Sequence, residues 1–113
     1  MNESFGQAHQ NFTRTTEPVA NTTRVEFNGS VIAESDNSLL LRETRHGTAF
    51  YFPWEDVRTE CLTASDLTTL CPFKGEATYW SVTVDGKCLE NAAWSYPDPG
   101  DGVPEIAGRI SFY

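Results

Sequence analysis

Two glycine-containing dipeptides constrain the fold of this chain more strongly than any other feature. They are Asn28-Gly29 and Asp85-Gly86, and apolar and polar residues alternate on both sides of each one. Asn-Gly and Asp-Gly are favoured two-residue connections of β hairpins, because both positions must adopt positive φ angles. Alternation is typical of strands that bury one face. The sequence therefore predicts two hairpins.

A two-residue turn also fixes which residues face each other across a hairpin. In the first hairpin, Phe27 pairs with Ser30 and Val25 with Ile32, so that the three apolar side chains share a buried face. In the second, the predicted pairs are Val84 with Lys87, Val82 with Leu89, Trp80 with Asn91, and Thr78 with Ala93.

The second hairpin has one apolar face and one mixed face. The apolar face carries Trp80, Val82, Val84, Leu89 and Ala93. The mixed face carries Tyr79, Ser81, Thr83, Cys88, Glu90, Ala92, Trp94 and Tyr96. Large aromatic rings give a pocket contact area, and polar groups orient the ligand. The mixed face is therefore a candidate pocket wall.

The rest of the chain completes a single compact domain. Residues 1–21 are polar, show little periodicity and predict an N-terminal arm or tail. Further strands are predicted at 39–43, 49–52, 58–63 and 109–113, with one helical turn at 53–57 and a polar loop at 64–69. We expect residues 22–113 to form a mainly β domain of short antiparallel strands and hairpins, with at most one or two helical turns.

The net charge and the cysteine spacing exclude several classes of binding partner and cofactor. Acids outnumber bases by 16 to 8, and a formal net charge of −8 does not suit binding to nucleic acid or anionic lipid. No apolar run approaches the ~20 residues of a membrane helix, and residues 1–10 do not resemble a secretory signal. Cys61, Cys71 and Cys88 form no Cys-x-x-Cys pair. We therefore expect a cytoplasmic protein with reduced cysteines, no metal and no cofactor.

The segment 71–75 places Lys74 in a turn bounded by Pro72 and Gly75, directly before the second hairpin. Such a lysine can reach the mixed face, where it would select a planar ligand with an anionic group. The predicted ligand-binding residues are Lys74, Tyr79, Glu90, Trp94 and Tyr96. The alternatives are a solvated turn lysine and aromatic rings that belong to the core.

Other reactive side chains leave the question of catalysis open. Cys71 is either a buried structural thiol or a nucleophile, and His46 is either a turn residue or a general base. Asp66 either caps its own loop or acts with Glu76 or Glu90 as a pair of carboxylates. No catalytic residue is assigned, so the sequence does not decide whether the domain is an enzyme.

Several motifs over roughly residues 23–113 resemble the bacterial and fungal family known as domain of unknown function 427. They include Cys71-Pro72-Phe73-Lys74-Gly75, Ala77-Thr78-Tyr79-Trp80, Ala93-Trp94-Ser95-Tyr96-Pro97 and Ile110-Ser111-Phe112-Tyr113. The resemblance implies a β-tent-like domain, a type whose zinc-holding members use paired Cys-x-x-Cys motifs that this chain lacks. The family also carries a nucleotidyltransferase-like label, but the sequence shows neither a glycine-rich phosphate loop nor Mg²⁺-binding carboxylates.

Two functions fit these observations. The first is a small-molecule-binding domain whose ligand occupies an aromatic pocket. The second is a non-catalytic interaction module, or a homodimer, that uses the same aromatic surface. A deep cavity with Lys74 pointing inward would favour the first, and a flat exposed aromatic patch would favour the second.

Overall fold

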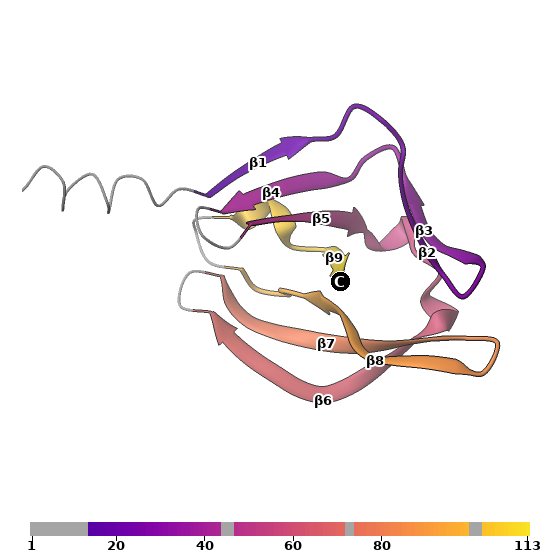
Figure 1. Ribbon diagram of the computed structural model, residues 1–113. Coiled ribbons are helices and arrows are strands. Elements are labelled where there is room, and N and C mark those ends of the chain that lie inside the picture. The colour runs from indigo at the N-terminus through magenta and orange to yellow at the C-terminus, as the bar shows by residue number, and fades with distance from the viewer. Residues whose placement is uncertain (1–13, 44–46, 72–73, 100–102) are drawn as a thin grey trace, which may run out of the picture.

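The computed structural model describes residues 14–43, 47–71, 74–99 and 103–113, and within these ranges the domain is built from antiparallel strands (Figure 1). The strands are β1 (Arg14–Pro18), β2 (Thr23–Phe27), β3 (Ser30–Ser35), β4 (Leu39–Glu43), β5 (Gly47–Pro53), β6 (Leu62–Cys71), β7 (Gly75–Val84), β8 (Lys87–Ser95) and β9 (Arg109–Phe112). The helical segments described are the 3₁₀ turns η1 (Trp54–Asp56), η2 (Thr59–Cys61) and η3 (Pro104–Ile106). The mainly β prediction is confirmed. No helix in the described ranges has the length and apolar character needed to cross a membrane.

Seven strands form one sheet in the order β1-β4-β5-β9-β8-β7-β6, and β2 pairs with β3 in a separate hairpin. Figure 1 shows the large sheet strongly bent, with β1 and β4 on one side and β6 and β7 on the other. The β2–β3 hairpin lies at one end of this sheet. The last strand, β9, lies between β5 and β8 and thereby joins the two sides.

Both predicted hairpin turns are present. Asn28 and Gly29 have φ angles of 50° and 83°, and Asp85 and Gly86 have φ angles of 50° and 80°. Two consecutive positive φ angles are the mark of the type I′ turn that matches the twist of the flanking strands.

The predicted register of the first hairpin holds next to the turn and then shifts by one residue. Phe27 pairs with Ser30 as expected, but Val25 pairs with Ala33 instead of Ile32, because a bulge lies between Val25 and Glu26. The three-residue apolar face survives this shift. Val25 and Phe27 pack against the buried cluster that contains Ile32.

The second hairpin is also bulged. Val84 pairs with Lys87 and Val82 with Leu89 as predicted, but beyond these pairs Trp80 faces Ala93 and Thr78 faces Ser95. The bulge advances β8 by two residues, which preserves the alternation of faces, and Asn91 lies in it with a φ angle of 53°.

Two residues nevertheless depart from their predicted faces. Leu89, expected in the core, is 49% exposed. Ala92, expected on the mixed face, is buried in the cluster that contains Ile32 and Val82. Both residues flank the bulge, where the regular pleat that sorts side chains between faces is interrupted.

Three segments differ from the prediction, and two of them belong to the edge strands of the sheet, β1 and β6. Residues 58–63 contain η2 before β6 begins, and the segment 64–69, predicted as a polar loop, is the middle of β6. β1 lies inside the segment expected as an N-terminal arm and pairs with β4, whereas residues 1–13 fall outside the described ranges. An edge strand with largely exposed side chains shows little apolar alternation, so the sequence pattern missed both strands.

Candidate functional site

A row of four side chains crosses the middle of the sheet. Tyr51 on β5 pairs with Ser111 on β9, Ser111 pairs with Trp94 on β8, and Trp94 pairs with Tyr79 on β7. Directly opposed residues of neighbouring strands point to the same face of a sheet. The register therefore places three aromatic rings on one face, with the small Ser111 between two of them.

Ser111 leaves space for Tyr51 and Trp94 to meet above it. The indole Nε1 of Trp94 donates a hydrogen bond of 3.0 Å to the Tyr51 hydroxyl oxygen. The two rings are in edge-to-face contact, with centroids 6.4 Å apart and planes at 89°. This geometry is favourable for aromatic pairs and fixes the orientation of the indole plane.

A cavity of about 730 Å³ opens over this face. Four of the five residues predicted to bind a ligand line it, namely Lys74, Tyr79, Trp94 and Tyr96. The fifth, Glu90, is exposed on β8 and is not part of the lining. The lining also includes residues that sequence reasoning did not assign to a pocket, among them Arg24, Glu43, Phe50, Tyr51, Cys71 and Tyr113.

Lys74 is a buried residue of this cavity. Its Nζ lies 2.7 Å from Oε1 of Glu43, and the two side chains are only 11% and 9% exposed. The same Nζ lies 5.2 Å from the centroid of the Tyr96 ring, within the range of a cation–π contact. Lys74 is therefore not a solvated turn lysine.

The local backbone explains how Lys74 is aimed. Its N–H donates to the carbonyl oxygen of Cys71, and Gly75 follows with a φ angle of 89°. A Cβ at Gly75 would lie 2.8 Å from the backbone oxygen of Asp98. Only glycine fits both the left-handed conformation and this close approach, so the turn that presents Lys74 depends on residue 75.

The outer part of the cavity is aromatic. The ring of Tyr113 lies over Trp94 at a centroid distance of 4.5 Å and remains 80% exposed. The Tyr79 hydroxyl is hydrogen-bonded to Thr69 Oγ1 at 3.0 Å. The exposed part of the lining therefore includes the Tyr113 ring, while the Lys74–Glu43 pair is buried.

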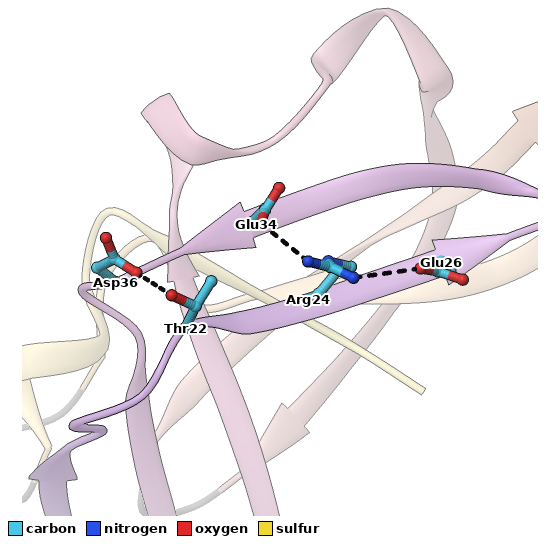
Figure 2. Close-up of polar contacts among 5 residues, drawn as sticks. All are labelled: Thr22, Arg24, Glu26, Glu34 and Asp36. Atoms are coloured by element: carbon cyan, nitrogen blue, oxygen red, sulfur yellow. Dashed lines mark hydrogen bonds and ion pairs between the residues drawn. The ribbon is translucent and has the colours of Figure 1, made fainter.

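The third charged lining residue, Arg24, is compensated by acids on its own hairpin. Its guanidinium lies 3.2 Å from Glu34 and 3.7 Å from Glu26 (Figure 2). Nearby, the Thr22 hydroxyl donates to Asp36. Three of these residues, Thr22, Glu34 and Asp36, line a second, polar cleft together with Ser35, Asn37 and Asp56. Among the described residues, no group of three or more His, Cys, Asp or Glu is arranged to hold a metal ion.

Of the remaining candidates that the structure describes, Cys71 lines the cavity and Asp66 does not. This half-buried thiol is free, as are the buried Cys61 and the exposed Cys88. Asp66 is exposed on β6, and the local cap there comes from Ser65, whose Oγ accepts from the Leu67 N–H. His46 lies outside the described residues.

Burial raises the pKa values of two tyrosines in the site. Desolvation, opposed by the Trp94 hydrogen bond and aided by the charge of Glu43, raises the pKa of Tyr51 to about 12. Burial also raises the pKa of Tyr96 above its ordinary value. Both phenols stay neutral at physiological pH and act there as hydrogen-bonding groups without charge.

The raised pKa of Tyr51 predicts alkaline destabilisation. Because its folded-state pKa lies above the unfolded value of 10, its contribution is complete below pH 10 and is lost as the pH rises through about 12. We expect a loss of about 3 kcal/mol over this interval from Tyr51. Urea unfolding at a series of alkaline pH values measures it, and Tyr51→Phe should remove the part of the loss that Tyr51 contributes while leaving that of Tyr96. An unchanged profile in Tyr51→Phe would contradict the assignment.

Comparison with known proteins places the chain in a family. No curated protein matches the chain. A family model described as "Domain of unknown function (DUF427)" matches residues 15–113, in agreement with the motif resemblance, and the chain belongs to this family.

Proposed function

We propose that this domain binds a small, flat organic molecule in the aromatic cavity, with a polar group of the ligand at Lys74. The observation that carries the proposal is the convergence of Lys74, Tyr79, Trp94 and Tyr96 on one cavity. Its volume of about 730 Å³ lies within the range of small-molecule sites. A concave site favours this function over the alternative of a flat aromatic interaction surface.

The shape of the ligand follows from the rings. Trp94 is in edge-to-face contact with Tyr51, and its ring centroid lies 4.5 Å from that of Tyr113, so the cavity lining offers aromatic rings held by their neighbours. Planar rings stack on such faces with more contact area than a puckered ring can reach. Lys74 then supplies a directional contact for an acceptor on the ligand.

The anionic group expected at Lys74 from the sequence would share the ammonium with Glu43, which lies 2.7 Å away. The lysine is therefore a hydrogen-bonding contact within an ion pair. The free thiols and the formal charge of −8 support a cytoplasmic protein that does not bind nucleic acid or anionic membranes. Whether a reaction follows binding is left open by this proposal.

Calorimetric titration with a flat probe and its saturated counterpart tests the proposal. We expect 2-naphthamide to bind at least fivefold more tightly than decahydro-2-naphthamide. Tyr113→Ala should lower the affinity for 2-naphthamide three- to tenfold, consistent with the energy of an aromatic contact of about 0.5–1.5 kcal/mol.

Leu70→Ala provides the matched control. Leu70 is 78% exposed, close to the 80% of Tyr113, but lies on β6 outside the lining of the cavity. We expect this variant to bind like the wild type. Equal binding of the two probes, or equal effects of the two substitutions, would contradict the proposed site.

A further inference from the structure

We infer that the ligand meets the Lys74–Glu43 pair with an uncharged edge that presents a carbonyl oxygen beside an N–H group, as in a carboxamide or a lactam. This inference rests on the proposed function and names the chemical class that the cavity would take. It is carried by one juxtaposition: a donor on Lys74 and an acceptor on Glu43, 2.7 Å apart, both in the lining of an aromatic cavity.

The pair has hydrogen-bonding capacity for such an edge. An ammonium has three N–H donors, and among the described residues Glu43 is the hydrogen-bond acceptor for Lys74. A carboxylate has two oxygens that together accept about four hydrogen bonds. One ligand oxygen can therefore accept from Lys74 while a neighbouring ligand N–H donates to Glu43.

The spacing of the two protein atoms also suits an amide. Standard bond lengths put the oxygen and nitrogen of one amide about 2.2 Å apart. Nζ of Lys74 and Oε1 of Glu43 are separated by 2.7 Å. Two nearly parallel hydrogen bonds can thus join the pair to one planar edge, in the manner of other bidentate contacts.

Charge decides against an ion as the ligand. Among the described residues, the charges of Lys74 and Glu43 offset each other, and the remaining charged lining residue, Arg24, faces Glu26 and Glu34. A carboxylate at Lys74 would lie beside the Glu43 carboxylate, where two like charges in a poorly solvated site repel strongly. A cation at Glu43 would meet the same difficulty with Lys74. A neutral edge avoids both penalties and still forms hydrogen bonds with each partner.

The test compares probes that differ only at this edge. For the wild-type protein we expect 2-naphthamide to bind at least tenfold more tightly than 2-naphthoate, measured by calorimetry at one pH and salt concentration. N,N-dimethyl-2-naphthamide keeps the carbonyl but lacks the N–H, and we expect it to bind at least fivefold more weakly than 2-naphthamide. These wild-type measurements need no variant.

Glu43→Gln tests the charge argument directly. It removes the repelling carboxylate, so we expect the affinity for 2-naphthoate to rise at least tenfold. 2-Naphthoate should then bind more tightly than 2-naphthamide. Glu17→Gln is the matched control, because Glu17 also accepts from a cation, Arg42, but does so at the exposed edge of the sheet. This control should keep the wild-type preference.

The outcomes separate the two proposals. Tighter binding of 2-naphthoate by the wild type, or no effect of the N-methyl groups, would overturn the inference and leave the aromatic site intact. The same holds if Glu43→Gln folds and keeps the wild-type preference. Failure of every flat probe to bind would overturn the proposed function together with this inference.

Discussion

Lys74→Met is expected to lower the free energy of unfolding by about 3–5 kcal/mol, the usual cost of removing one partner from a buried ion pair. The Glu43 carboxylate, 9% exposed, then stays in the cavity wall without the ammonium 2.7 Å away. Methionine keeps most of the volume of the lysine, so the loss reports the charge and not a void. Urea unfolding of the wild type and the variant measures the difference.

Two further variants test whether that loss of stability comes from the unpaired buried charge. In the double variant Lys74→Met with Glu43→Leu, both charges are gone, and we expect most of the stability to return. Arg42→Met breaks the Arg42–Glu17 pair, whose side chains are more than half exposed, and should cost no more than about 1 kcal/mol. If Lys74→Met costs no more than Arg42→Met, the buried pair does not stabilise the fold.

Gly75→Ala is expected to cost about 3 kcal/mol. Roughly 1–2 kcal/mol comes from a left-handed conformation that alanine adopts poorly, and a further ~1–3 kcal/mol from forcing a methyl group against the backbone. That methyl group would lie 2.8 Å from the Asp98 oxygen. Because Gly75 follows Lys74 directly, the affinity for a cavity probe should fall together with the stability.

Gly86→Ala separates these two contributions. Gly86 has a φ angle of 80°, close to that of Gly75, but a Cβ there would meet no atom within 4 Å. Thermal unfolding of both variants should therefore show the larger loss for Gly75→Ala. Probe affinity should be unchanged in Gly86→Ala, because the turn at Asp85-Gly86 is not part of the cavity lining. Equal losses of stability would contradict the proposed contact with Asp98.

Local chemistry was sufficient to predict the hairpins and much of the pocket wall. The turn dipeptides determine hairpin type without reference to the rest of the chain, and the parity of the pleat places Tyr79 and Trp94 on one face. Lys74 was identified because it precedes that hairpin in a turn with glycine. These features depend on neighbours in sequence, which is why the residues alone revealed them.

The missing parts of the site depend on contacts between distant segments. Glu43 ends a strand 31 residues before Lys74, and nothing in its own surroundings marks it as the partner. Tyr51 reaches Trp94 only because β9 lies between their strands. The bulge at Asn91 contains no glycine, the residue that usually indicates a positive φ angle in a sequence. The predicted pairs beyond Val82 were therefore wrong.

The central position of β9 has a consequence for the order of folding. β1, β4 and β5 form one half of the large sheet and β6, β7 and β8 the other, and β9, which follows all six in the sequence, connects them. Until β9 docks, β5 and β8 each present an open edge that can pair with another chain. A nascent chain must therefore hold two incomplete half-sheets until β9 has been synthesised and has docked, and it is most exposed to aggregation in that interval. The contact between Tyr51 and Trp94 forms only when β9 docks, so a complete cavity marks a domain in which the two half-sheets have been joined.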